Sequence, residues 1–256
     1  MRFRPCIDIH NGKVKQIVGS SLRDKDDEAH DNYVSDKDAT YYARLYKEMG
    51  LGGGHVIMLN HKGSEYYEAT KAQALSALRA YPQGMMAGGG INSDNAEEYL
   101  DAGASHVIVT SYVFSGGCID MVALKRIKGI VGRERLCLDL SCRRRGKDYY
   151  IVTDRWQSFT DEKLEGGLLD FLSEYASEFL VHAVDTEGKQ QGIEDDVLPM
   201  LAESPIPVTY AGGVSSLEDV KKLKLAGKDK IDVTVGSALS IFGGSLEIGE
   251  ILRCIS

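Results

Sequence analysis

The stretch Ala211-Gly212-Gly213-Val214-Ser215-Ser216-Leu217-Glu218-Asp219 has a counterpart earlier in the chain, Ala87-Gly88-Gly89-Gly90-Ile91-Asn92-Ser93-Asp94. Each copy follows a short apolar run that predicts a buried strand, and each opens a segment with helical spacing. Glycine-rich turns that lead into a helix expose backbone N–H groups, and the helix dipole favours an anion there. The two copies therefore predict two anion sites and a ligand that carries two phosphates.

Small residues complete each predicted phosphate site. A second short strand follows each glycine motif and ends at Thr110-Ser111 in the first copy and at Gly236-Ser237 in the second. The alternative is that the motifs are tight strand-to-helix turns that bind no ligand. Their duplication favours phosphate, so the predicted phosphate-binding residues are Gly89, Gly90, Thr110, Ser111, Gly212, Gly213, Gly236 and Ser237.

Eight short apolar runs alternate with helical segments along the whole chain. The expected strands cover residues 3–9, 55–59, 85–87, 106–110, 136–140, 179–184, 208–211 and 231–235. Eight βα units close naturally into a (β/α)8 TIM barrel, and no linker divides residues 1–256, so we expect one α/β domain. Residues 19–38 are expected to form a long surface loop, and residues 149–156 a hairpin-like excursion after the fifth strand.

The chain repeats itself at the scale of half a barrel. Asp8 in Cys6-Ile7-Asp8-Ile9 corresponds to Asp139 in Cys137-Leu138-Asp139-Leu140, just as the first glycine motif corresponds to the second. This pattern predicts two (βα)4 halves, approximately residues 1–132 and 133–256. The twofold relation would place one carboxylate on each side of the barrel mouth, between the two phosphate sites.

Composition narrows the class of protein. The net charge of −8 argues against a nucleic-acid-binding surface, which would need a basic face. No apolar run is long enough to span a bilayer, and the expected first strand begins too early to leave room for a targeting peptide. The five cysteines form no CxxC pair, so we expect reduced thiols, no metal site and a cytoplasmic protein.

Several motifs together resemble the histidine-biosynthesis half-barrel family. They are Pro5-Cys6-Ile7-Asp8-Ile9 with Gly12-Lys13-Val14, Gly88-Gly89-Gly90-Ile91, Leu138-Asp139-Leu140, Asp185 with Glu187-Gly188, and Ala211-Gly212-Gly213-Val214-Ser215-Ser216. The resemblance covers essentially the whole chain and is closest to the isomerase branch, in its eukaryotic-like form. It implies an Amadori rearrangement of an aminoaldose with a phosphate at each end, without a metal or an organic cofactor.

The resemblance also implies roles for the acidic residues. The reaction needs a general base at the sugar C2 and a general acid at the ring oxygen. By resemblance Asp8 is the base and Asp139 the acid, but His182 and Glu187 stand where bacterial relatives carry a threonine and an aspartate. The acid is therefore Asp139, Glu187 or His182. A structural role for His182 at the end of its strand is an equally good interpretation, and His55 is expected to be structural.

Basic and aromatic residues follow the fifth strand. Arg143, Arg144 and Arg145 could belong to a solvated basic loop, or could close over the substrate together with Trp156. In the second interpretation Trp156 stacks on the imidazole and a guanidinium holds the carboxamide or a phosphate.

Two other functions stay open. A cyclase that receives ammonia from a glutaminase partner shares the fold and both aspartates, and would need a lysine after the first strand and a polar, gated barrel bottom. Lys13 and Lys15 are present there. A sugar-phosphate sensor without turnover is the third possibility, although it would not need both aspartates. The twofold repeat within one chain makes a monomer self-sufficient, and the expected partner is a small bisphosphate.

Overall fold

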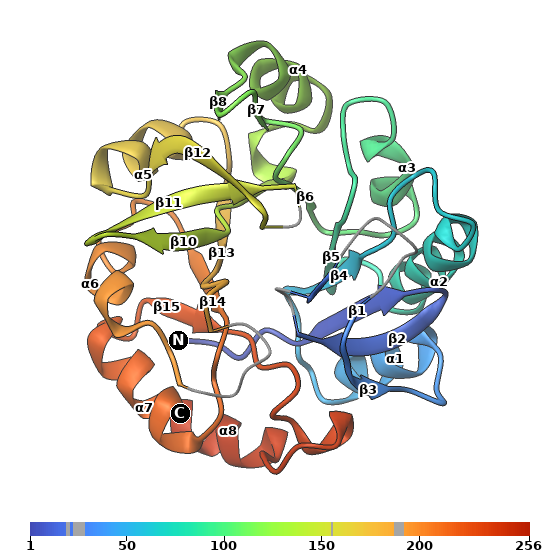
Figure 1. The fold of residues 1–256 in the computed structure, drawn as a ribbon. Helices are drawn as coiled ribbons and strands as arrows, with labels where there is room; N and C mark the ends of the chain where they lie inside the picture. Colours follow the sequence, from blue (N-terminus) through green and yellow to red (C-terminus); the bar gives the residue numbers. More distant parts are fainter. Residues whose placement is uncertain (19–20, 23–28, 155, 187–191) are drawn as a thin grey trace.

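The computed structural model describes residues 1–18, 21–22, 29–154, 156–186 and 192–256. Within these residues, eight parallel strands form a ring that is surrounded by helices (Figure 1). The strands of the ring are β1 (Cys6–His10), β4 (Gly54–Met58), β5 (Met85–Gly88), β6 (Val107–Val109), β9 (Leu136–Asp139), β13 (Glu178–His182), β14 (Val208–Ala211) and β15 (Ile231–Val233). The predicted (β/α)8 barrel is confirmed.

The first residues of the chain close the ring. Phe3 forms a parallel bridge with Val233 of β15. The backbone N–H of Arg4 donates to the Val233 carbonyl at 2.8 Å, and the Val233 N–H donates to the Arg2 carbonyl at 2.9 Å. β1 therefore has β4 on one side and, through the residues just before it, β15 on the other.

Helices cover the outside of the barrel. They are α1 (Ala39–Glu48), α2 (Tyr67–Ala80), α3 (Ala96–Asp101), α4 (Met121–Val131), α5 (Gly166–Ser173), α6 (Leu198–Leu201), α7 (Leu217–Ala226) and α8 (Ile248–Ile255). Side-chain caps fix where several begin: Asp38 accepts from the Tyr41 N–H at α1, and Asp120 accepts from two N–H groups at α4. None of the helices in the described residues is long and apolar enough to cross a membrane.

The apolar core has two parts. The larger lies between the strands and the helices, and the smaller fills the barrel. Side chains alternate along a strand, so Glu178, Leu180 and His182 of β13 all point into the barrel at successive levels. The middle level contains the apolar cluster Met86, Ile108, Cys137, Leu180 and Ala211, and the buried His55 is paired with Met86 there.

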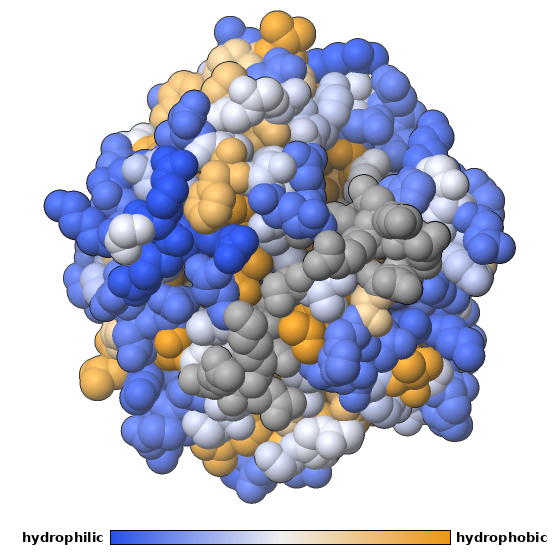
Figure 2. All heavy atoms as spheres, in the orientation of Figure 1, coloured by the Kyte–Doolittle hydropathy of each residue, from blue (hydrophilic) through white to orange (hydrophobic). Residues whose placement is uncertain are grey.

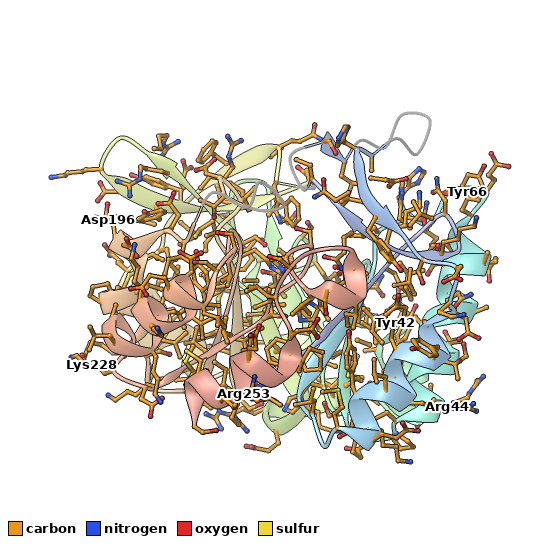
Figure 3. All side chains as sticks on the ribbon, turned by 90° about the horizontal axis from the view of Figure 1, so that it is seen from below. Tyr42, Arg44, Tyr66, Asp196, Lys228 and Arg253 are labelled. Atoms are coloured by element: carbon orange, nitrogen blue, oxygen red, sulfur yellow. The ribbon has the colours of Figure 1, made fainter. Side chains whose placement is uncertain are left out.

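Antiparallel strands extend the barrel after its first and fifth strands. β2 (Lys13–Ile17) pairs with β1 and with β3 (Asp31–Val34), whereas β10 (Cys142–Arg145), β11 (Asp148–Thr153) and β12 (Ser158–Lys163) form a separate sheet. β7 (Phe114–Ser115) and β8 (Cys118–Ile119) form a two-stranded ladder. Figure 3 shows both large extensions at one end of the barrel, while Arg44 and Arg253 lie toward the other.

The expected excursion after the fifth strand is confirmed. The expected surface loop over residues 19–38 is wrong at residues 31–34, and residues 19–20 and 23–28 of it lie outside the described residues. There, β3 pairs with β2 through Lys15 with Val34 and Gln16 with Tyr33. The two extensions thus follow the first and the fifth strand of the barrel, although β2 and β3 continue the barrel sheet and β10–β12 form a sheet of their own.

Candidate active site

A cavity of about 650 Å³ opens at the carboxyl ends of the barrel strands, and its lining residues come from positions 6 to 237 of the chain. This is the end at which TIM barrels place their active sites. The predicted residues that line it are Asp8, Gly89, Gly90, Thr110, Ser111, Asp139, Trp156, His182, Gly212, Gly213, Gly236 and Ser237. The structure thus brings both aspartates and both glycine motifs to one cavity.

Asp139 ends β9 and is 8% exposed. Its Oδ1 accepts a hydrogen bond from the Ser141 hydroxyl at 2.8 Å and lies 3.3 Å from Nδ1 of His182. Its Oδ2 accepts from the Thr110 hydroxyl at 3.2 Å. A carboxylate with so little access to water needs such partners, and here they hold it in one orientation at the cavity wall.

Asp8 lies on β1, opposite Asp139 in the repeat, and is half-buried. The side-chain amide of Gln16 on β2 donates to Asp8 Oδ2 at 3.1 Å. Gln16 is buried and lines the cavity, yet it was not predicted as a site residue. The dipeptide Asn11-Gly12, typical of a two-residue hairpin turn, is the signal that could have placed Gln16 on a strand beside Asp8.

Three aromatic rings lie close together at the cavity wall. The His182 ring centroid is 5.9 Å from that of Trp156 and 6.1 Å from that of His55. Burial, and to a smaller extent the neighbouring His182, lowers the pKa of His55 to about 3. His55 is therefore neutral at physiological pH. It also lines the cavity, which the expectation of a structural role did not include.

The glycine motifs have backbone conformations that other residues rarely adopt. Gly89 has φ +94° and Gly213 has φ +72°. A Cβ at Gly89 would lie 2.0 Å from the Met58 carbonyl oxygen, and one at Gly213 would lie 2.0 Å from the Gly192 carbonyl oxygen. Only glycine fits at either turn, so the duplicated motif is required by the backbone as well as by the predicted phosphate contacts.

The start of α7 is already occupied by a carboxylate. Asp219 Oδ2 accepts from the backbone N–H groups of Ser215 and Ser216 at 2.9 and 3.0 Å, and from both hydroxyls. Burial raises the pKa of Asp219, but these hydrogen bonds outweigh it and the net shift is downward. A phosphate at this motif would therefore have to use the glycine turn and the end of β15 more than the N–H groups of Ser215 and Ser216.

The three arginines after β9 lie on β10 and are not among the residues that line the cavity. Arg143 forms an ion pair with Asp185 at 2.9 Å, and Arg144 pairs with Glu194 and Asp196 at 3.2 and 2.6 Å. The Arg145 guanidinium lies 3.9 Å from the Tyr150 ring centroid. Figure 2 shows a strongly hydrophilic surface in the region of β10–β12.

Other predicted groups have different outcomes. Glu187 lies outside the described residues. Lys15 pairs with Asp31 at 2.8 Å, Lys13 is exposed, and neither lines the cavity. In the described part of the chain, no group of three or more acidic, histidine or cysteine side chains could hold a metal ion. The five cysteines are free thiols.

The chain is similar to known proteins over nearly its whole length. The family described as histidine biosynthesis protein matches residues 2–246. A chloroplastic 1-(5-phosphoribosyl)-5-((5-phosphoribosylamino)methylideneamino) imidazole-4-carboxamide isomerase of Medicago truncatula is 56% identical over 257 residues, which cover 98% of this chain and 81% of that relative.

Fungal relatives carry the same isomerase name. The protein of Neurospora crassa is 43% identical over 95% of this chain and 93% of its own length. That of Saccharomyces cerevisiae is 40% identical over 96% of this chain and 94% of its own length.

Proposed function

The chain belongs to the histidine biosynthesis protein family, and we propose that it is the isomerase for which its plant and fungal relatives are named. Its substrate is an imidazole carboxamide with two phosphoribosyl groups, and its reaction is the Amadori rearrangement of the aminoaldose to the aminoketose. The observation that carries this function is the single cavity that holds Asp8 and Asp139 between two glycine turns.

The rearrangement moves one proton from C2 of the sugar to C1. An acid protonates the ring oxygen as the C1–O bond breaks, which leaves a Schiff base at C1. A base then removes the C2 proton to give an enolamine, and protonation at C1 together with loss of the C2 hydroxyl proton gives the ketose. Two carboxyl groups in one cavity can supply both roles if they differ in protonation state.

The surroundings of the two aspartates support different roles. Asp8 is held by Gln16 and is half-buried, which suits a base that approaches a carbon. Asp139 lies beside Ser141, Thr110 and His182, groups that can pass or hold a proton at its oxygens. We assign Asp8 as the base and Asp139, with His182 next to it, as the acid side, and Glu187 stays an alternative acid.

The two glycine turns hold the two ends of the substrate in this proposal. Gly89 and Gly90 with Thr110 and Ser111 would take one phosphate, and Gly212 and Gly213 with Gly236 and Ser237 the other. A ligand bound at both ends spans the cavity and brings its central sugar between the aspartates. Trp156 at the cavity wall would stack on the substrate, while Arg143, Arg144 and Arg145 would act from outside the lining or not at all.

The cyclase alternative has one feature in its favour. The barrel bottom is polar, because Arg4, Glu178 and Asp232 form a buried ion-pair network there. The apolar level of Met86, Ile108, Cys137, Leu180 and Ala211 separates this network from the cavity, however. Among the described residues after β1, Gln16 donates a hydrogen bond to Asp8, and a glutamine supplies no ammonium group. These observations favour the isomerase.

One assay separates the functions. The purified protein is incubated with the aminoaldose alone, and the conversion is followed by ultraviolet absorbance. Isomerisation without ammonia or glutaminase supports the proposal. Turnover only of the ketose with ammonia would indicate the cyclase, and binding without turnover would indicate the sensor.

The monomeric state and the cytoplasmic location remain proposals. The repeat gives one chain both halves of the site, which supports a monomer. The Medicago truncatula relative is named as chloroplastic, so the compartment of this chain needs its own measurement.

A further inference from the structure

Ser141 lies between Trp156 and Asp139 and is completely buried. The indole N–H of Trp156 donates to the Ser141 hydroxyl oxygen at 2.9 Å, and that hydroxyl donates to Asp139 Oδ1 at 2.8 Å. The three side chains form a continuous hydrogen-bonded chain from the excursion after β9 to the predicted acid.

The direction of these hydrogen bonds is determined by chemistry. An indole nitrogen can only donate, so the Ser141 oxygen is the acceptor from Trp156. Ser141 has a single hydroxyl proton, and because its oxygen accepts from Trp156, that proton is directed to Oδ1 of Asp139, which accepts it. Hydrogen bonds in such a chain polarise one another, so the Trp156 contact strengthens the donation to Asp139.

The backbone of Ser141 is fixed independently of this chain. Its carbonyl accepts from the Val152 N–H of β11 at 2.9 Å. The next residue, Cys142, is bridged to Ala183 after β13. The position of the Ser141 Cα is therefore fixed by the backbone, whereas the rotamer of its hydroxyl depends on the hydrogen bonds with Trp156 and Asp139.

Trp156 reaches Asp139 by a second contact as well. Its ring lies 5.9 Å from His182, whose Nδ1 is 3.3 Å from the same Oδ1 of Asp139. Trp156 also has φ +67°, a left-handed conformation that is unfavourable for a tryptophan. Its side-chain contacts help to keep the backbone in that conformation.

We propose that Ser141 is a positioning residue that couples the placement of Trp156 over the cavity to the orientation of the Asp139 carboxylate. The proposal rests on the isomerase function. When Trp156 covers the substrate, Ser141 holds the Asp139 carboxyl group in its orientation. When Trp156 is displaced, the Ser141 hydroxyl can rotate away from Asp139. Ser141 itself touches no substrate in this scheme.

The test uses the full chain and four variants. Ser141→Ala removes the hydroxyl, Trp156→Phe removes the indole N–H, and the double variant removes both. Thr160→Val is the matched control. Thr160 is a buried residue of β12, and its hydroxyl donates to the Ile151 carbonyl of β11 and not to a residue of the site. Ser141→Cys, a smaller change, replaces Ser141→Ala should the latter fail to fold.

Two quantities are measured for each protein. The first is kcat and KM with the aminoaldose. The second is the emission spectrum of Trp156, which is the single tryptophan of the chain and so reports its own surroundings. Emission is recorded with and without the aminoaldose for the proteins that retain Trp156.

The expected result is a loss in kcat with little change in KM. Losing the hydrogen bond that orients the Asp139 carboxyl group lowers kcat about tenfold in Ser141→Ala. The Trp156 emission shifts in the same variant, and Thr160→Val matches the wild type in both measurements. In the double variant the two losses in kcat do not multiply, because both changes break one chain.

Three outcomes overturn the coupling: wild-type kcat in Ser141→Ala, unchanged Trp156 emission in that variant, or losses that multiply in the double variant. A failure of the isomerase function is distinguishable, because the wild type would then not convert the aminoaldose. The emission of the unliganded Ser141→Ala variant would still report whether Ser141 holds Trp156.

Discussion

His182 and Asp139 lie on neighbouring strands of the barrel, and Nδ1 of the histidine is 3.3 Å from Oδ1 of the aspartate. The pairing of Leu180 with Asp139 sets this contact, because it places His182 two residues further toward the cavity. On the acid side of the site, the imidazole of His182 therefore lies within reach of one carboxyl oxygen of Asp139.

Replacing His182 tests its part in that pair. His182→Ala should lower kcat about 10²-fold, since general acid–base groups contribute about 10²–10⁴-fold. His182→Gln keeps a polar group near Asp139 and should retain more activity. Steady-state kinetics with the aminoaldose checks both. Full activity in His182→Ala would leave Asp139 or Glu187 as the acid without help from this histidine.

Asp8→Asn should abolish turnover while the fold and substrate binding persist. The amide keeps the size and the contact with Gln16 but cannot accept the C2 proton, so kcat should fall at least about 10²-fold. Quenching of Trp156 measures binding. Asp31→Asn, at an exposed aspartate that pairs with Lys15, is the control and should keep wild-type kinetics. Retained turnover in Asp8→Asn would sink the assignment of the base.

Gly236→Ala should damage both binding and chemistry. A Cβ at Gly236 would lie 2.3 Å from Gln16 Oε1, so the Gln16 side chain must move and release Asp8. KM should rise and kcat should fall. Gly129→Ala in α4 is the control, because a Cβ there meets open space and should stabilise the helix by up to about 1 kcal/mol without altering kinetics. Unchanged kcat in Gly236→Ala would show that Gln16 does not position Asp8.

Arg4→Met should destabilise the barrel bottom. Arg4 pairs with Glu178 at 3.4 Å and with Asp232 at 2.8 Å, and all three side chains are buried. Removing the cation takes away the ion pair of Glu178 and leaves its hydrogen bond with the neutral Thr209 hydroxyl, so the free energy of unfolding should fall by about 3–5 kcal/mol. Urea unfolding measures the change.

The same variant has a defined pH dependence. Burial raises the pKa of Glu178 above its ordinary value of 4.5, although Arg4 and Thr209 oppose the shift. The folded state therefore binds the proton more tightly than the unfolded state. The stability that this protonation gives is complete below pH 4.5 and is lost as the pH rises through the raised pKa. Without Arg4 the loss should extend to higher pH. An unfolding difference between Arg4→Met and wild type that does not vary with pH would contradict this.

Much of the fold could be predicted because its signals are local. The apolar runs, the glycine turns and the repeat each occupy a few consecutive residues, and together they specify a barrel. β3 was missed because Asp31–Val34 is largely exposed and polar, so its pairing with β2 leaves no alternation to find. The half-barrel boundary near residue 132 stays a prediction.

The candidate site could be predicted only in part. Asp8 and Asp139 stand out as charges in apolar runs, and the structure places both in the cavity. Gln16 and Ser141 carry no such signal, because their importance comes from contacts with residues on other elements. The arginines directly follow the strand that carries Asp139, and this position suggested a role at the substrate. Their ion-pair partners could not be predicted, because Asp185, Glu194 and Asp196 are distant in the sequence from Arg143 and Arg144.

The bridge between Phe3 and Val233 has a consequence for synthesis of the chain. Val233 leaves the ribosome only after all the residues between the two partners have been made, so the ring stays open until then. During that time the N–H and C=O groups of the residues just before β1 are unpaired on the side that later meets β15, and they can pair with another nascent chain. On the same side, the C-terminal end of β1 is covered early, because it pairs with β2 through residues only a few positions apart. This local hairpin therefore leaves only the residues just before β1 to wait for β15.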